Sequence, residues 1–215
     1  MSTLEKDNFF DHDYYFGGKK SNYFNYEMLN AKKLFKGPLD YIKKYELGGK
    51  ILDAGCALGL FLNEAAPFFT DLYGCDISDF AVDNAKKRLP QGNFKVVNLE
   101  EEIPYPDEFF DCITALDVLD HTQKYAQVFR ELLKKLKKGG HLILSMPING
   151  WAYKLLGFLD KDKSHVSILG EKIIVDMLAA SNVDIIESSK YSILPIFYRV
   201  SFLQSEIDFL IRKNH

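Results

Sequence analysis

Short apolar runs alternate with amphipathic segments from residue 50 onward. The apolar runs, typical of buried strands, occupy residues 50–55, 71–77, 93–99, 110–116, 141–148 and 183–189. The segments 58–68, 78–89, 122–137 and 170–181 have the apolar spacing of helices. Strands that alternate with helices predict an α/β fold with a doubly wound, mostly parallel sheet. In such sheets, ligands bind at the carboxyl ends of the strands.

The N-terminal part of the chain has a different pattern. Residues 9–26 contain eight aromatic side chains without a clear period, and residues 27–45 have helical spacing that Gly37 and Pro38 are expected to interrupt. We therefore predict an N-terminal lid and helical extension over residues 1–47 and a ligand-binding domain over residues 48–215, within one compact unit. The aromatic stretch could equally be a docking surface or a dimer contact. Residues 192–215 fit either strands or a helix.

Composition excludes several classes of partner. The 215 residues carry a formal net charge of −3, which gives no electrostatic footprint for nucleic acid or for an acidic membrane. No apolar stretch reaches the roughly 18 residues of a membrane helix, and the N-terminus lacks a signal pattern. Three widely spaced cysteines show no metal-binding spacing. We expect a cytoplasmic monomer or homodimer with no nucleic-acid or membrane partner.

The sequence ILDAGCALGLF (residues 51–61) carries the first functional signal. Asp53 stands near the end of a strand, and Gly55 and Gly59 follow it. The dinucleotide pattern G-x-G-x-x-G fits poorly, because its later glycine positions hold Ala57 and Leu60. A carboxylate here would repel a pyrophosphate and favour an ammonium or sulfonium group. Asp53 could also simply accept hydrogen bonds from loop amides.

A second carboxylate, Asp76, ends the next predicted strand. A carboxylate at this place can accept hydrogen bonds from both ribose hydroxyls of a nucleoside. Its alternative role is to cap the following helix, for which Ser78 is the better candidate. Asp76 therefore predicts a nucleoside ligand without naming it.

These motifs resemble those of class I S-adenosylmethionine-dependent methyltransferases. LDAGCALG is similar to their first motif, roughly D-x-G-x-G-x-G, with Ala57 in place of the middle glycine. At the end of the third strand, VVNLEEEIPYPDEFFDCI is similar to the family pattern D-A-x-x-L-P-F-x-x-x-x-F-D. The resemblance covers residues 48–150 and implies a Rossmann-like fold with a seven-stranded sheet and S-adenosyl-L-methionine as cofactor. Asn98 stands where the family usually has an acid near the adenine. The implied cofactor-binding residues are Asp53, Ala54, Gly55, Cys56, Gly59, Asp76, Ile77, Asn98, Leu99, Glu100 and Leu116.

The segment ALDVLDHT (residues 115–122) ends the fourth strand. The resemblance places Asp117, His121 and the later His165 on the side of the methyl acceptor, with His121 as the base that takes a proton from the acceptor. His121 could also be a packed structural residue. The D-x-x-D-H spacing of Asp117, Asp120 and His121, with His165, is similar to that of metal-using members of the class. We favour capping and surface roles for the two aspartates and assign no metal site.

The predicted function is methyl transfer from S-adenosylmethionine to a small organic acceptor, first of all to an oxygen. The aromatic stretch 9–26, with Tyr14, Tyr15, Phe16 and Tyr23, and the segment 148–165, with Trp151, are expected to contact this acceptor. One alternative is a non-catalytic S-adenosylmethionine-binding protein. A less favoured alternative is an NAD-dependent oxidoreductase.

Overall fold

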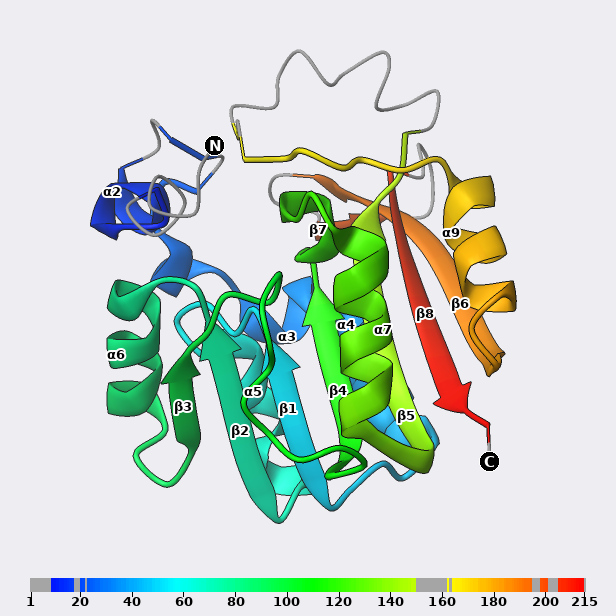
Figure 1. Cartoon of the computed structure of the whole chain (residues 1–215). Helices are drawn as coiled ribbons and strands as arrows, with labels where there is room; N and C mark the ends of the chain where they lie inside the picture. Colours follow the sequence, from blue (N-terminus) through cyan, green and yellow to red (C-terminus); the bar gives the residue numbers. More distant parts are fainter. Residues whose placement is uncertain are drawn as a thin grey trace.

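The computed structural model describes residues 9–17, 20–21, 23–149, 162, 164–194, 198–200 and 205–214. Within these ranges one sheet has the strand order β3-β2-β1-β4-β5-β8-β6-β7 (Figure 1). The strands are β1 (Lys50–Ala54), β2 (Asp71–Asp76), β3 (Asn93–Val96), β4 (Phe110–Leu116), β5 (Leu136–Pro147), β6 (Val183–Leu194), β7 (Tyr198–Val200) and β8 (Glu206–Lys213). Neighbours from β3 to β5 are parallel, whereas β8 runs antiparallel between β5 and β6.

Helices cover both faces of the sheet (Figure 1). One face packs against α7 and α9, and the other packs against α4, α5 and α6. The helices are α2 (His12–Phe16), α3 (Ala31–Leu34), α4 (Lys36–Lys44), α5 (Leu60–Ala65), α6 (Asp79–Arg88), α7 (Tyr125–Lys135) and α9 (Glu171–Ala179). The 3-10 turns are η1 (Tyr26–Met28), η2 (Ala66–Phe68) and η3 (Leu119–His121). This arrangement confirms the predicted doubly wound α/β fold.

The central strands are apolar on both faces because both faces are covered. In β1, Ile51 and Leu52 are both fully buried, and they belong to the two different core clusters on opposite sides of the sheet. In β4, Cys112 and Ile113 alternate in the same way. Strands buried on both faces appear in a sequence as continuous apolar runs rather than as alternating ones, which is the pattern that predicted them.

Element boundaries depart from expectation in two places. The N-terminal helical segment breaks at Phe35, and Pro38 lies in the first turn of α4, where a missing backbone N–H is tolerated. The residues of the ambiguous C-terminal segment form the end of β6, β7 and β8, so among the described residues all but Ser205 and Asn214 lie in strands. The division at residues 47 and 48 stays a prediction.

The three cysteines are free and buried. Burial raises the pKa of the Cys75 thiol to about 12, so the thiol stays protonated near neutral pH. In the described part of the chain, no helix is both long enough and apolar enough to cross a bilayer.

Candidate functional site

The loop after β1 is held tightly against the end of β2. The backbone N–H groups of Gly55 and Cys56 both donate to the carbonyl oxygen of Cys75, at 2.7 and 2.9 Å. Gly55 has a φ of +80°, and a Cβ on it would lie 2.3 Å from Cγ2 of Val118. Only glycine fits this position, because a side chain would have an unfavourable backbone conformation and would clash with Val118. We call residues 55–59 the glycine loop.

Ala57, which replaces the middle glycine of the family motif, also has a positive φ of 46°. Its N–H donates to Oδ2 of Asp76 at 2.9 Å. The other carboxylate oxygen of Asp76 accepts from the N–H of Ser78 at 3.0 Å. Asp76 therefore joins the glycine loop to the loop after β2, while the Ser78 hydroxyl caps α6 by accepting from the N–H of Ala81.

Asp53 lies beneath the glycine loop and is 3 % exposed. Its Oδ1 accepts a hydrogen bond of 2.7 Å from the hydroxyl of Thr114, its register partner on β4. Burial raises the pKa of the Asp53 carboxyl to about 7, and the charge of Asp76 adds to this rise, although the Thr114 hydrogen bond opposes it. Two buried carboxylates that repel each other form a site whose electrostatics favour a cationic ligand.

The raised pKa of Asp53 predicts that stability falls with rising pH. The pKa of Asp53 is 3.8 in the unfolded chain and about 7 in the folded protein, so between these pH values the native state binds the proton more strongly. The free energy of unfolding therefore decreases as the pH rises through this window. The Asp53→Asn variant keeps an acceptor for Thr114 and does not titrate. From pH 5 to pH 8, the wild type should lose more stability than this variant, by an amount on the order of 3 kcal/mol.

Urea unfolding of both proteins at the two pH values, without cofactor, measures this difference. Parallel pH profiles for wild type and variant would show that Asp53 ionises normally in the folded state.

The remaining predicted cofactor residues surround the same end of the sheet. Ala54 ends β1, and Ile77 follows β2 with partial exposure. The Asn98 Oδ1 accepts a hydrogen bond of 3.0 Å from the N–H of Glu100. The side-chain amide that was expected to face the adenine therefore also stabilises the turn at residues 98–100. Leu99 is buried in the core cluster on the α7 side of the sheet, and Leu116 at the end of β4 is partly exposed.

Residues after β4 depart from one expectation. Asp120 in η3 is completely buried, and α7 begins at Tyr125 without a side-chain cap. The expectation of a surface or helix-capping role for Asp120 is therefore wrong. The structure brings the ligating atoms of Asp120, His121 and His165 within 4.8 Å of one another. Asp117 lies outside this group and adopts a positive φ of 53°. We call Asp120, His121 and His165 the histidine cluster.

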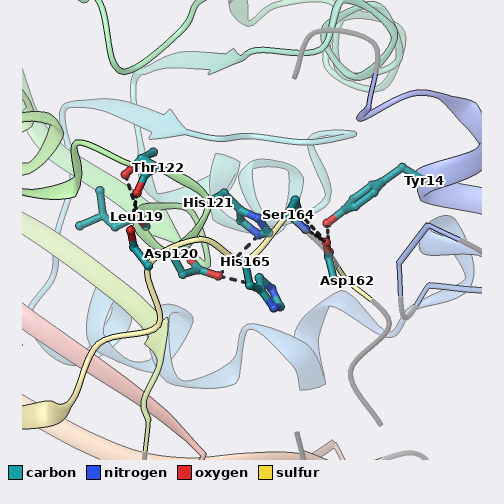
Figure 2. A network of polar contacts seen from close by, with 9 residues as sticks. Tyr14, Leu119, Asp120, His121, Thr122, Asp162, Ser164 and His165 are labelled. Carbon is teal, nitrogen blue, oxygen red and sulfur yellow. Dashed lines mark hydrogen bonds and ion pairs between the residues drawn. The ribbon is translucent and has the colours of Figure 1, made fainter. Parts of the chain in front are cut away.

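A chain of polar contacts links the histidine cluster to the N-terminal segment (Figure 2). His121 Nδ1 and the Ser164 hydroxyl lie 2.8 Å apart. Ser164 in turn donates a short hydrogen bond to Oδ1 of Asp162, whose Oδ2 accepts from the hydroxyl of Tyr14 at 2.6 Å. Tyr14 belongs to α2, which lies beyond the carboxyl ends of the central strands (Figure 1).

Aromatic side chains of the N-terminal segment cover the site. Tyr14, Tyr15 and Tyr26 are buried together with Leu58 and Leu60 of the loop and helix after β1. The ring of Phe10 meets the ring of His121 edge to face, with centroids 5.7 Å apart. The lid role of the segment stays a prediction. Trp151 lies outside the described residues.

The surroundings of the histidine cluster are acidic. Burial raises the pKa of Glu206 at the start of β8 well above its ordinary value, and the charges of Asp117, Asp120 and Asp208 raise it further. Asp208 accepts from the hydroxyls of Ser145 and Tyr191. Several carboxylates therefore converge near the ends of β4, β5 and β8, which favours positive charge at this place.

A family model described as "Methyltransferase domain" matches residues 26–188. The chain belongs to this methyltransferase family. The match confirms the class I S-adenosylmethionine-dependent methyltransferase identified from the sequence motifs, and it confirms S-adenosylmethionine as the cofactor at the level of the family. The glycine loop, Asp53 and Asp76 lie within the matched range.

Related proteins differ in the acceptor that their names give. The chain is 30% identical over 115 residues to a ubiquinone biosynthesis O-methyltransferase of Alkalilimnicola ehrlichii, covering 50% of this chain and 46% of the relative. It is 32% identical over 105 residues to phosphoethanolamine N-methyltransferase 3 of Arabidopsis thaliana, covering 46% of this chain and 21% of the relative. These matches span less than half the length of either relative.

Among solved structures, the fold is similar to that of magnesium protoporphyrin IX methyltransferase from Synechocystis PCC 6803 with bound SAH. The TM-score is 0.67 with 20% identity, and the similarity covers 86% of this chain and 83% of that one.

Several residues in this part of the structure were not among those predicted from the sequence. Thr114 could have been identified from the sequence, because a polar residue in the middle of an apolar strand suggests a buried hydrogen bond. Asp162 and Ser164 stand just before His165 in the sequence, but nothing in a linear pattern pairs them with Tyr14 and His121. Glu206 lies in the segment that was ambiguous between strand and helix.

Proposed function

We propose that this methyltransferase transfers the methyl group of S-adenosylmethionine to a hydroxyl oxygen of a small organic acceptor. The proposal is supported by the position of the histidine cluster, two of whose residues lie in η3, just after the carboxyl end of β4. We assign this place to the acceptor. The sulfonium already supplies a good leaving group. The protein must therefore align the acceptor and help to remove its proton as the carbon–oxygen bond forms.

Each group of residues has a distinct role in this proposal. Asp53 and the glycine loop hold the methionine part of the cofactor, and Asp76 accepts hydrogen bonds from its ribose. Asn98, Leu99, Glu100 and Leu116 lie around the adenine. His121, with Asp117 and His165 beside it, faces the acceptor. The aromatic N-terminal segment excludes water, which strengthens the electrostatic interactions in the site.

Two measurements test the proposal. Calorimetric titration of the full chain with S-adenosylmethionine, S-adenosylhomocysteine and NAD should give binding for the first two only. Transfer of a labelled methyl group is then measured to 3,4-dihydroxybenzoate as a hydroxyl probe and to phosphoethanolamine as an amine probe.

Methylation of the hydroxyl probe supports the proposal. Methylation of the amine probe alone would overturn the oxygen assignment, and binding of NAD alone would overturn the cofactor assignment as well. Cofactor binding without transfer to either probe favours the non-catalytic alternative.

A further inference from the structure

The hydrogen bonds around Ser164 place a proton on Nδ1 of His121. A serine hydroxyl has a single proton, and Ser164 donates it to Oδ1 of Asp162. The contact of 2.8 Å between Ser164 Oγ and His121 Nδ1 therefore requires the imidazole Nδ1–H to donate. In the neutral ring, the other nitrogen, Nε2, then carries a lone pair.

That lone pair faces a carboxylate. Nε2 of His121 lies 3.6 Å from Oδ2 of Asp120, and Nε2 of His165 lies 3.4 Å from the same oxygen. The Asp120 side chain is completely buried, and within the described residues neither of its oxygens accepts a hydrogen bond. A buried carboxylate without hydrogen bonds is costly unless a positive charge neutralises it.

The distances from Oδ2 of Asp120 to the two imidazole nitrogens indicate whether a proton or a metal ion supplies the positive charge. A proton shared between nitrogen and oxygen gives a separation of about 2.7–3.2 Å. Two ligand atoms bound to one tetrahedral zinc ion, each at about 2.0–2.1 Å, lie about 3.3 Å apart. The observed separations of 3.4 and 3.6 Å are longer than hydrogen bonds and close to the zinc value.

We propose that Asp120, His121 and His165 bind a divalent transition-metal ion, with Zn²⁺ as the ion that the donor set and the spacing fit best (Figure 2). Two imidazole nitrogens and one carboxylate oxygen are ordinary zinc ligands. Three protein ligands leave a fourth position for an oxygen ligand, as in catalytic zinc sites.

The backbone prepares this arrangement. The N–H groups of Val166 and Ser167 both donate to the carbonyl oxygen of Asp120, at 2.8 and 2.9 Å, which holds the loop carrying His165 beside η3. The hydrogen bond from His121 Nδ1 to Ser164 orients the ring, as outer partners of metal-binding histidines commonly do.

This inference changes the sequence interpretation, which assigned no metal and would have placed Asp117 among the ligands. It also deepens the proposed function, on which its catalytic meaning rests. A zinc ion that binds the acceptor hydroxyl would lower the pKa of that hydroxyl. His121 would then be a ligand rather than the base. Metal binding itself does not depend on methyl transfer.

The test uses the full chain after treatment with a chelator. Zn²⁺ affinity is measured by competition with a chromophoric chelator, and Co²⁺ is added separately to record its visible spectrum. We expect one ion per chain and the intense absorption of four-coordinate cobalt. Asp120→Asn and His165→Ala should each weaken Zn²⁺ binding at least about tenfold and abolish the cobalt band. His141→Ala, which removes a histidine from β5, should bind like the wild type.

Circular dichroism and the unfolding temperature identify a variant that fails to fold. His165→Ala carries the test if Asp120→Asn unfolds, because the His165 side chain is 18% exposed and lies in a loop. The proposal is overturned if the wild type gives no four-coordinate cobalt spectrum, or if folded His165→Ala binds zinc as tightly as the wild type. Methyl transfer that persists without any bound metal would overturn the catalytic role of the metal and support the proposed function. Zinc binding without methyl transfer would support the metal site and count against the proposed function.

Discussion

Replacing Asp76 with alanine is expected to weaken S-adenosylmethionine binding by at least about a hundredfold. The Asp76 carboxylate is 8 % exposed at the end of β2, where it can accept hydrogen bonds from both ribose hydroxyls. Hydrogen bonds to a charged group contribute about 1.5–3 kcal/mol each, so the loss of two corresponds to about 3 kcal/mol or more. Calorimetric titration of the folded variant measures this effect.

Comparing two ligands separates ribose binding by Asp76 from attraction between its charge and the sulfonium. S-adenosylhomocysteine carries the same ribose but lacks the sulfonium charge, so Asp76→Ala should weaken both ligands by similar factors. A much larger loss for S-adenosylmethionine would mean that Asp76 acts on the sulfonium instead. Asp79→Ala is the matched control, because Asp79 is an exposed carboxylate three residues further on, in the first turn of α6.

The Asp76 side chain also has a structural role that the variant removes. Its two oxygens accept from the N–H groups of Ala57 and Ser78. Asp76→Asn keeps the shape but turns its NH₂ group towards one of these donors, so an intermediate loss of affinity is expected. If the unfolding temperature of Asp76→Ala falls sharply while Asp76→Asn binds normally, the residue organises the loops and does not bind the ribose.

The strand-end carboxylates were predictable because their signal is local. Asp53 and Asp76 each stand at the end of an apolar run, and the alternation of strands and helices predicts that those ends meet at one edge. Gly55 was predictable for the same reason. Gly55 has a φ of +80° and lies close to Val118, and glycine is the residue that tolerates both.

The polar network around His121 was not predictable, because it depends on contacts between distant residues. Ser164 lies 43 residues from His121 in the sequence, and Tyr14 lies 148 residues from Asp162. The burial of Asp120 has the same origin, since the loop that donates to its carbonyl oxygen comes from residues 166 and 167. A period in the sequence reports which face of an element is apolar, but it does not report which loops meet above a sheet.

The strand order in the C-terminal half shows the same limit. Apolar spacing alone left residues 192–215 open between strand and helix. In the structure, β8 inserts between β5 and β6, and it pairs antiparallel with both. This insertion places Glu206 opposite Pro147 and among the carboxylates near the histidine cluster. A pattern read in chain order could not place a late strand in the interior of the sheet.

Replacing His121 with alanine is expected to lower the rate of methyl transfer by about a hundredfold to ten-thousandfold, which is the usual contribution of a positioned acid–base group. The loss of a ligand to the proposed metal ion, which would activate the acceptor hydroxyl, predicts a fall in the same direction. In the described residues, the hydrogen bonds that Cys75 and Asp76 accept beside the glycine loop come from backbone N–H groups, and His121 acts on Asp76 through its charge. The affinity for S-adenosylmethionine should therefore change less than the rate. The variant is assayed with 3,4-dihydroxybenzoate and labelled cofactor, and the cofactor affinity is measured by calorimetry on the same preparation.

Two further variants distinguish a direct role of His121 from general damage to the site. Ser164→Ala removes the partner of Nδ1 and leaves the imidazole in place, so a smaller loss of about tenfold to a hundredfold is expected. His141→Ala removes a histidine at the opposite end of the β4 and β5 pair and should leave the rate unchanged. Equal losses for all three variants would contradict a specific role. A loss of cofactor affinity as large as the loss of rate would place His121 in the cofactor site, so that the acceptor would have to bind elsewhere along the carboxyl edge of the sheet.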